Sequence, residues 1–339
     1  MTKGSQTHRI KTLLVGLGKM GQGYADDPEM AKYFKYATHA QVLSRHPAFD
    51  WQAMVDIDDG ALAVANDTWK VAHKACCIAD LGSLAGDIEL AVLATNPGLR
   101  LAMIDELPNL KAVLVEKPLG GTLAEAESFL AECDRRNIMV QVNLWRRADQ
   151  LYRSLAGGQL AELIGPVQAA SCVYGNGVLN NGTHMIDFAR MLFGEVDGVR
   201  LLGPAAGFVE GPLPGDRNIA FQLDMHSGLS IPFVPLRFSD YRENGLLIWG
   251  ATGRLEILNE GLVVNSYGRE PNRAMQGEWE VASDRPRPLE PTVGTALYDM
   301  FDNLALALAA DDTAILVSPG RSAIATSQLV DGLLHMGDA

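Results

Sequence analysis

The sequence predicts an α/β protein of two domains, the first built on a parallel sheet and the second on an open, mainly antiparallel sheet. Its 339 residues suffice for about two domains. Up to about residue 145, short apolar runs alternate with helix-like stretches, as in parallel strands joined by helices. Beyond that point, strand-like runs follow one another with little helix between them, which favours antiparallel pairing. We therefore expect domains over 1–145 and 146–339.

The strands of the first domain are expected to be buried on both faces, because their apolar runs lack polar alternation. A helix is predicted over Thr122–Arg136, where the apolar residues have helical spacing and Thr122 with Glu125 forms a capping-box pattern. The predicted strands are Ile10–Val15, Trp51–Asp56, Leu90–Ala94, Ala112–Glu116 and Ile138–Val142.

The second domain is expected to combine its sheet with one early helix, Thr183–Phe193. Helices over Thr295–Ala309 and Arg321–Leu334 close the chain and can pack back on the first domain. The segment Gly268–Pro291, rich in Pro, Arg and Glu, is predicted to be a long surface loop. The predicted strands are Val167–Tyr174, Ala220–Met225, Leu229–Phe233, Leu246–Trp249 and Arg254–Ile257.

Composition and charge disfavour several classes of function. The formal charge of 28 − 41 = −13 repels phosphate backbones and anionic lipids, so neither nucleic acid nor a membrane is an expected partner. Apolar stretches fall short of the ~20 residues that span a bilayer, and the N-terminus lacks the pattern of a signal peptide. The four cysteines form no Cys-x-x-Cys pair, which predicts reduced thiols in a cytoplasmic protein and no metal site.

A glycine-rich hexapeptide follows the first predicted strand directly. Gly16 would permit a tight turn, Gly18 would let backbone amides approach a pyrophosphate, and Gly21 would allow close helix–strand packing. Placed there, the motif predicts a dinucleotide-binding turn that includes Lys19 and Met20, rather than a merely structural turn.

The second predicted strand ends in Asp56-Ile57-Asp58, where a carboxylate can bind a ribose diol and repel a 2′-phosphate. This favours NAD, with NADP the less expected cofactor. Asp56 lies 35 residues past Gly21, whereas the usual spacing is about 20, so an insertion is expected, with Tyr24–Thr38 the natural candidate. The alternative is that Asp56 and Asp58 are ordinary turn carboxylates.

The next two strands also end in polar residues. Thr95, Asn96 and Pro97 follow the third strand and are expected to face the cofactor crevice. The fourth strand ends in Glu116-Lys117-Pro118, and a partly desolvated lysine there could serve as an acid or base. Alternatively, Lys117 merely pairs with Glu116 on the surface.

In the second half, Asn180 and Thr183 precede His184, which is placed in the first turn of an amphipathic helix. The positive helix end disfavours an imidazolium, so the ring can accept a proton near neutral pH. A purely structural histidine is the alternative.

Together these residues make the chain resemble the glucose-fructose oxidoreductase, inositol dehydrogenase and rhizopine-catabolism family (Gfo/Idh/MocA). The resemblance runs from the glycine turn through Glu116-Lys117-Pro118 and Gly182-x-His184 to Gly250-Ala251-Thr252-Gly253. It implies an N-terminal Rossmann domain and a C-terminal α/β domain whose open sheet often serves as an oligomer interface. It also implies a nicotinamide cofactor, a sugar-like substrate and a homodimer or homotetramer.

The resemblance makes Lys117 the lysine that touches the reacting hydroxyl and His184 the histidine beside it. Many members carry an acidic residue four positions before that histidine, where this chain has Asn180, so a carboxylate-assisted proton relay is in doubt. The peptide bond before Pro118 is expected to be cis. Trp145 and Arg146 match a segment in which the arginine lines the site, a buried structural ion pair being the alternative.

These inferences predict an NAD-dependent dehydrogenase that transfers a hydride between the nicotinamide and a hydroxyl or keto carbon of a sugar, polyol or sugar derivative. Lys117 and His184 are the predicted catalytic residues, and both are also expected to bind the substrate. The further predicted substrate-binding residues are Trp145, Arg146, Asn180 and Thr183, and Glu116 and Lys117 are included among the predicted cofactor-binding residues. Two alternatives remain open. One is a redox-neutral lyase or glycosidase of the same fold, and the other is a non-catalytic regulator that senses NAD and a sugar.

Overall fold

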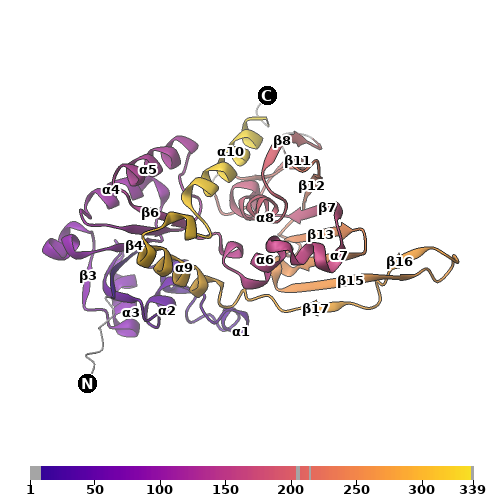
Figure 1. Cartoon of the computed structure of the whole chain (residues 1–339). Helices are drawn as coiled ribbons and strands as arrows, with labels where there is room; N and C mark the ends of the chain where they lie inside the picture. The colour runs from indigo at the N-terminus through magenta and orange to yellow at the C-terminus, as the bar shows by residue number, and fades with distance from the viewer. Residues whose placement is uncertain (1–8, 204–206, 214, 337–339) are drawn as a thin grey trace, which may run out of the picture. The chain divides into compact units, whose positions relative to one another are not determined.

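The computed structural model describes residues 9–203, 207–213 and 215–336 of the chain, which divides into two compact units. The first unit comprises Met1–Ala148 and Gly294–Ile324, and the second Asp149–Val293 and Ala325–Ala339. Each unit is described by itself below (Figure 1). The last helix, α10 (Gly320–Met336), begins in the first unit and ends in the second.

The first unit is built on a six-stranded parallel sheet in the order β3-β2-β1-β4-β5-β6. The five predicted strands are all present, which confirms the parallel α/β prediction. The sixth, β3, was not predicted, because it has only three residues and none of them is buried. The bounds are β1 Ile10–Val15, β2 Phe49–Val55, β3 His73–Ala75, β4 Leu90–Leu93, β5 Ala112–Val115 and β6 Met139–Val142.

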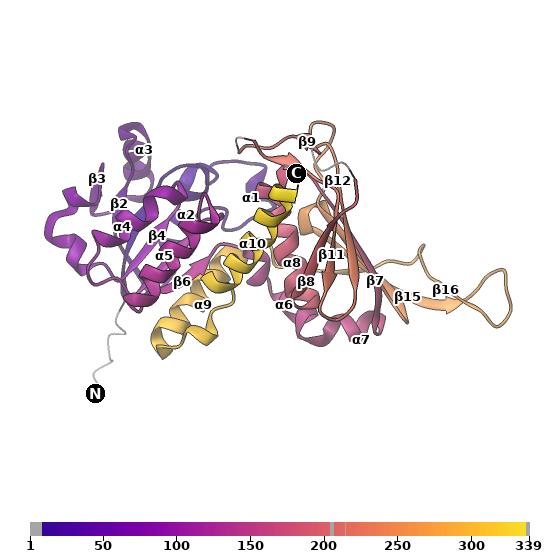
Figure 2. The same ribbon diagram turned by 90° about the horizontal axis from the view of Figure 1, so that it is seen from above.

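Helices cover both faces of this sheet (Figure 2), which explains why its strands are apolar throughout. On one face, α4 (Arg100–Asp105) and α5 (Leu123–Arg135) pack over the sheet. The other face is covered by α2 (His39–Leu43), α3 (Asp59–Trp69) and α9 (Ala296–Ala310).

The N-terminus of α5 forms half of the predicted capping box. The Thr122 hydroxyl accepts a hydrogen bond from the Glu125 amide at 3.2 Å. The Glu125 carboxylate accepts instead from the amide of Gly121 at 2.9 Å, one residue before the cap. Both hydrogen bonds thus stabilise the start of α5, but the bond to the Glu125 carboxylate comes from the amide of Gly121 rather than from that of the cap residue itself.

The insertion expected after the glycine turn is present. A single π-helical turn, η1 (Lys19–Gly23), begins after Gly18 and contains Gly21, and the short α1 (Met30–Tyr33) separates it from α2. A capping box between Thr38 and Gln41 starts α2 afresh. The remaining short helices of the first unit are η2 Ala79–Asp87, η3 Pro97–Leu99, η4 Trp145–Arg147 and η8 Thr313–Ile315.

The second unit is built on a nine-stranded sheet in the order β16-β15-β14-β13-β7-β12-β11-β8, with β17 also paired to β15. Among the strand pairs that the described residues form in this sheet, only β7–β12 is parallel, which confirms a mainly antiparallel sheet. Its strands are β7 Val167–Tyr174, β8 Val196–Leu201, β11 Phe221–Met225, β12 Ser230–Pro235, β13 Gly245–Gly250, β14 Gly253–Leu258, β15 Val263–Pro271, β16 Trp279–Val281 and β17 Arg287–Leu289.

The predicted helix α8 (Thr183–Phe193) is confirmed over the expected residues. The buried face of the sheet carries aromatic side chains, of which Phe221 and Phe233 stack with ring centroids 4.6 Å apart. The other small elements of this unit are α6 Gln150–Ser154, η5 Leu155–Gln159, α7 Leu160–Ile164, η6 Gly177–Gly182, η7 Asn259–Gly261, and the strand pair β9 Phe208–Val209 and β10 Arg217–Asn218.

The surface loop predicted over Gly268–Pro291 is wrong, because the segment contains the end of β15 together with β16 and β17. These strands form an extended ribbon (Figure 1). Two contacts stabilise it: the Arg269 guanidinium of β15 lies 4.7 Å from the ring centroid of Trp279 in β16, and Arg285, in the connection from β16 to β17, pairs with Glu270 of β15 at 2.8 Å. Because charged residues make these pairs, the segment lacks the apolar alternation typical of a strand.

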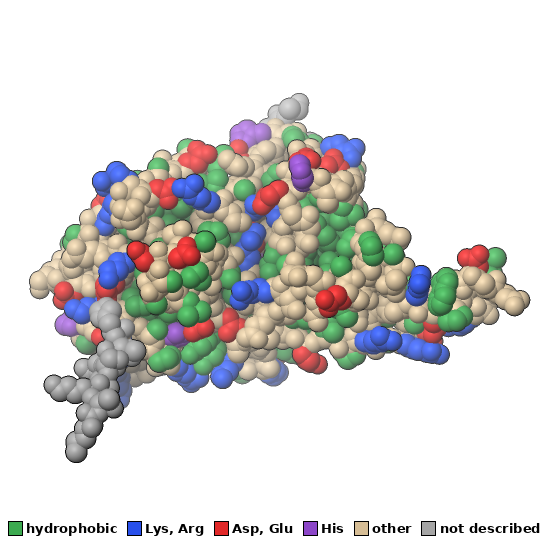
Figure 3. Space-filling model, viewed as in Figure 1, with side chains coloured by type: hydrophobic (Ala, Val, Ile, Leu, Met, Phe, Trp, Pro, Cys, Tyr) green, Lys and Arg blue, Asp and Glu red, His purple; other side chains and the backbone are tan. Residues whose placement is uncertain are grey.

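None of the helices in the described part of the chain combines the length and apolar character that a membrane crossing requires. Acidic, basic and hydrophobic side chains are interspersed over the face shown in Figure 3.

Candidate functional site

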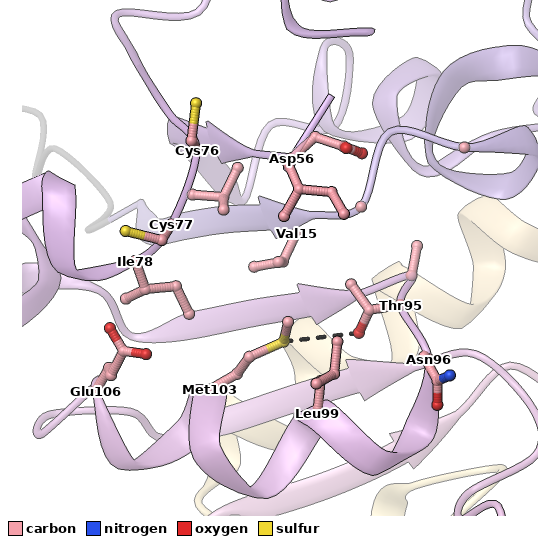
Figure 4. A pocket seen from close by; sticks show the side chains of 15 residues that line it. Val15, Asp56, Cys76, Cys77, Ile78, Thr95, Asn96, Leu99, Met103 and Glu106 are labelled. Carbon is pink, nitrogen blue, oxygen red and sulfur yellow. Dashed lines mark hydrogen bonds between the residues drawn. The ribbon is translucent and has the colours of Figure 1, made fainter. Parts of the chain in front are cut away.

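A cavity of about 350 Å³ opens at the carboxyl ends of β1, β2 and β4 in the first unit (Figure 4). The chain order reverses here, since β1 pairs with β2 on one side and β4 on the other, and ligands of open parallel sheets bind at such a point. The cavity is lined by Val15, Gly16, Gly18, Val55, Asp56, Ile57, Cys76, Cys77, Ile78, Ala94, Thr95, Asn96, Leu99, Met103 and Glu106.

Glycine is found at the three positions of the turn for different structural reasons. Gly16 has a φ of 92°, and a Cβ there would lie 2.4 Å from the carbonyl oxygen of Ala94. A Cβ on Gly21 would lie 2.1 Å from the carbonyl oxygen of Gly16. A Cβ on Gly18, in contrast, would meet no described atom of the chain within 4 Å. Packing therefore demands glycine at 16 and 21, whereas position 18 faces space that a ligand can fill.

The two carboxylates after β2 have separate roles. One Asp56 oxygen accepts from the Leu17 amide at 2.6 Å and the other from the Asp58 amide at 2.9 Å. Asp58 caps α3 by accepting from the amides of Gly60 and Ala61. Asp58 is thus a helix cap, while Asp56 joins the glycine turn to the cavity wall.

The far end of the cavity was not anticipated from the sequence. In Figure 4, Cys77 and Glu106 lie at the end opposite Asn96. Cys76 and Cys77 follow the short β3, and Met103 and Glu106 come from α4 and its C-cap. Cys76 and Cys77 could have been found only by recognising β3 as a strand, because its end places them beside Asp56. The apolar walls fit a flat ring such as adenine, and the Asp56 carboxylate fits a ribose.

Six of the predicted cofactor-binding residues line this cavity: Gly16, Gly18, Asp56, Ile57, Thr95 and Asn96. The other six, Lys19, Met20, Gly21, Pro97, Glu116 and Lys117, lie outside its lining. Gly21 packs under the turn, as its contact with Gly16 shows.

Glu116 lies in a buried polar cluster in the same unit. Its Oε1 accepts from Nε2 of His39 at 2.8 Å and from Nδ2 of Asn143 at 2.7 Å. Burial raises the pKa of the Glu116 carboxyl, but these hydrogen bonds and the charge of Lys117 outweigh it, so the pKa lies below its ordinary value. Glu116 is thus held as a carboxylate immediately before Lys117. The Lys117–Pro118 peptide bond is cis, as expected.

The predicted substrate residues at the end of the first unit lie in η4. Arg146 is 6% exposed, and its guanidinium carbon lies 4.4 Å from the Trp145 ring centroid. Stacking against the face of the guanidinium holds an arginine in place, while its N–H groups still point outward in the plane of the guanidinium.

The second unit holds the other predicted substrate residues. His184 lies in the first turn of α8, as predicted, and Asn180 lies in the π-helical turn η6 just before it. The Thr183 hydroxyl donates to the carbonyl oxygen of Leu179 at 2.8 Å. Asn181 was not predicted; its Nδ2 is buried and makes no hydrogen bond within the described part of the chain.

Two carboxylates that sequence reasoning missed hold this turn. Asp216 is fully buried and accepts from the amides of Leu179 at 2.9 Å and Asn180 at 3.0 Å. Glu210 accepts from the amide of Asn176, the residue before the turn, at 3.4 Å, from Nδ2 of Asn218 at 2.7 Å and from the amide of Phe238 at 3.1 Å. No local motif marks either residue, because the loops they join are distant in sequence.

A parallel sheet, a glycine turn after its first strand and a carboxylate-bearing cavity at its switch point define a dinucleotide-binding α/β domain. Residues 10–144 match the model of the GFO_IDH_MocA family, an oxidoreductase family with an NAD-binding Rossmann fold. Over these residues the first domain of the chain therefore matches a family of NAD-binding oxidoreductases. This confirms the resemblance inferred from the sequence.

Among curated proteins, trans-1,2-dihydrobenzene-1,2-diol dehydrogenase from Oryctolagus cuniculus is 32% identical over 127 residues. That match covers 32% of this chain and 38% of the length of that protein.

Solved structures of several differently named proteins match this chain over nearly its whole length. Levoglucosan dehydrogenase in complex with NADH matches with a TM-score of 0.72 at 16% identity, covering 98% of this chain and 97% of that one. UDP-N-acetylglucosamine 3-dehydrogenase from Acidithiobacillus ferrooxidans matches with a TM-score of 0.70 at 12% identity, covering 97% of each chain. A super-repressor mutant of Gal80p from Saccharomyces cerevisiae matches with a TM-score of 0.71 at 12% identity, covering 98% and 96%. At such identities the likeness shows the fold alone.

Proposed function

We propose that the protein is an NAD-dependent dehydrogenase that oxidises a hydroxyl group of a sugar, polyol or sugar derivative, or reduces the corresponding ketone. The observation that carries this proposal is the cavity at the switch point, where Gly18 faces open space and Asp56 presents a carboxylate. The match of residues 10–144 to an oxidoreductase family supports hydride transfer.

The residues present fit a dinucleotide. Gly16, Gly18 and the turn that follows would hold the pyrophosphate, Asp56 the ribose, and the walls formed by Ile57, Ile78 and Met103 the adenine. A 2′-phosphate would stand against the Asp56 carboxylate, so NAD is the proposed cofactor and NADP the less favoured one. Bound NAD would supply the nicotinamide carbon that accepts the hydride.

The proposed chemistry assigns proton transfer to Lys117 and His184. As the substrate C–H bond gives up its hydride, Lys117 or His184 accepts the proton of the hydroxyl on the same carbon, leaving a ketone. Asn180 would hydrogen-bond a neighbouring hydroxyl. Trp145, Arg146 and Thr183 are the further proposed substrate-binding residues. The reverse reaction uses the same groups in the opposite direction.

A non-catalytic sensor of NAD and a sugar is the second candidate, and two observations favour it. Asn180 stands where many family members carry an acidic residue, and one structure with this fold is a repressor mutant. Against it stands the presence of both Lys117 and His184. A redox-neutral lyase or glycosidase would keep these residues and retain its NAD through turnover.

In the first step of the test, NAD, NADP and NADH are titrated into the purified protein, and binding is monitored by tryptophan fluorescence. A panel of sugars, polyols, sugar nucleotides and a trans-dihydrodiol is then screened at the NADH absorbance band. Preferential binding of NAD with NADH formation on one substrate supports the dehydrogenase. Binding without NADH formation on any substrate favours the sensor or the redox-neutral enzyme, and absence of dinucleotide binding overturns all three.

The proposed assembly is a homodimer or homotetramer formed through the open sheet of the second unit. Sedimentation velocity on the full chain tests it, because a monomer at micromolar concentration would contradict the proposal.

A further inference from the structure

Arg100 has the largest fully buried side chain of the first unit, and it is not among the predicted site residues. It begins α4 and is 1% exposed. Its Nη1 donates to the carbonyl oxygens of Pro118 at 2.7 Å and Leu119 at 3.1 Å, and its Nη2 donates to that of Thr95 at 3.0 Å. All three acceptors are backbone atoms, so the guanidinium holds main chain rather than another side chain.

These contacts join two loops that carry the proposed cofactor and catalytic residues. Thr95 follows β4 and lines the cavity. Pro118 and Leu119 follow β5 and come directly after Lys117. A single side chain therefore fixes the path of the main chain after two adjacent strands at their carboxyl ends.

Burying a charged group costs free energy of desolvation. Burial lowers the pKa of Arg100 to about 10, although the charge of Glu116 opposes this, so the guanidinium remains protonated at neutral pH. An aliphatic side chain would avoid this desolvation but would leave three carbonyl oxygens without their donor. Only the planar fork of arginine presents several donors at fixed angles to such a set.

The residue before Lys117 is fixed as well. The Glu116 carboxylate is held by His39 and Asn143, as described above. Lys117 thus stands between a neighbour anchored through its side chain and a neighbour anchored through its carbonyl oxygen. This arrangement restricts the backbone of Lys117 from both sides.

We propose that Arg100 is a positioning residue, whose guanidinium holds the 118–119 backbone against the loop after β4 and thereby fixes the direction in which Lys117 is presented. This inference rests on the proposed function of Lys117. Arg100 itself, buried beneath the loops, transfers no proton and touches no substrate.

The test uses Arg100→Gln, which introduces no buried charge, and Arg100→Lys, which keeps the charge but lacks the fork. Arg136→Gln is the matched control, because Arg136 donates to the carbonyl oxygens of Ile104 at 2.6 Å and Leu107 at 2.5 Å, away from Lys117. If Arg100→Gln does not fold, Arg100→Lys carries the comparison.

Hydrogen exchange of the full chain, read by mass spectrometry, is the first measurement. In the Arg100 variants we expect peptides that contain 117–121 to exchange at least about tenfold faster than in the parent protein. Acylation of Lys117 by an amine-reactive ester should also become faster. Arg136→Gln should change neither. Unchanged exchange and acylation in folded Arg100 variants would overturn the proposal.

Turnover supplies the second measurement. We expect the Arg100 variants to lose about 100-fold in kcat, while the Kd for NAD changes far less, because misplacing a catalytic group slows the chemical step more than binding. A merely structural role would lower the melting temperature and leave kcat per folded molecule unchanged. If Lys117→Met proves fully active, the proposed function of Lys117 fails, whereas the exchange data still decide whether Arg100 holds the loop.

Discussion

The carboxylate of Asp56 and the backbone amide of Leu17 are joined by a hydrogen bond of 2.6 Å, which ties the end of β2 to the glycine turn after β1. The second oxygen of Asp56 is bonded to the Asp58 amide. Each carboxylate oxygen can accept more than one hydrogen bond, so these contacts orient the group without exhausting it. Asp56 therefore shapes the turn and also presents negative charge to the cavity.

Replacing Asp56 should change the choice of dinucleotide. Asp56→Ser removes the charge that would repel a 2′-phosphate, so we expect the ratio of the Kd for NADP to that for NAD to fall by about tenfold, measured by fluorescence titration. Asp58→Ser is the control, because Asp58 serves as the cap of α3. It should leave the ratio unchanged. An unchanged ratio in Asp56→Ser would contradict the assignment of Asp56 to the ribose.

The glycines at 18 and 21 should respond to alanine in opposite ways. In Gly18→Ala the new methyl group meets no described atom of the chain within 4 Å, so we expect a normal melting temperature and weakened NAD binding. In Gly21→Ala the methyl group meets the Gly16 carbonyl oxygen at 2.1 Å, so we expect a large loss of stability. Thermal denaturation and NAD titration of the two variants separate a ligand-facing glycine from a packing glycine. Equal loss of melting temperature in both would disprove the distinction.

Lys117→Met should abolish turnover while NAD still binds. The side chain keeps a comparable length but loses the ammonium group that the proposed proton transfer requires. Lys111→Met is a suitable control, because Lys111 pairs with Glu89 at the surface at 2.7 Å. The measurements are kcat on the substrate found by the panel and the Kd for NAD. Loss of NAD binding together with turnover would assign Lys117 mainly to holding the cofactor.

The elements that the sequence predicts well are those with an uninterrupted apolar face. Helix α8 and strand β7 were predicted over their full lengths, because their buried positions recur at the helical and strand periods. The short β3 and the ribbon of β15–β17 were missed. They are stabilised by edge pairing and by charged or aromatic cross-strand contacts, which leave no periodic apolar signal.

The candidate site divides in the same way. The glycine turn and Asp56 carry local signals, because one tight turn and one strand end define them. Arg100 and Glu210 carry none, since each acts on backbone atoms of loops distant in sequence. An alternating α/β pattern predicts that strand ends meet, but it does not predict which buried side chain bridges the loops that follow them.

The loops of the second unit should loosen in acid because Glu210 joins them. Burial raises the pKa of this carboxyl, but hydrogen bonds from the Phe238 and Ser239 amides and from Asn218 outweigh it, so the pKa lies below the ordinary value of 4.5. A carboxyl whose pKa is lower in the folded than in the unfolded state stabilises the fold above the unfolded value. That contribution disappears as the pH falls through the folded value.

We therefore expect Glu210→Gln to lower the melting temperature at neutral pH, and the difference from the parent protein to shrink as the pH falls below about 4.5. Glu243→Gln is the control of opposite sign, because burial raises the pKa of Glu243 and ionisation there opposes folding. The melting temperature of Glu243→Gln, relative to that of the parent protein, should increase as the pH rises from about 4 to about 7, the range in which such a carboxyl titrates. Melting curves of the three proteins from about pH 7 down to about pH 2 provide the measurement. A Glu210→Gln difference that stays constant with pH would mean that the ionised carboxylate is not what holds the loops around Asn176 and Phe238 together.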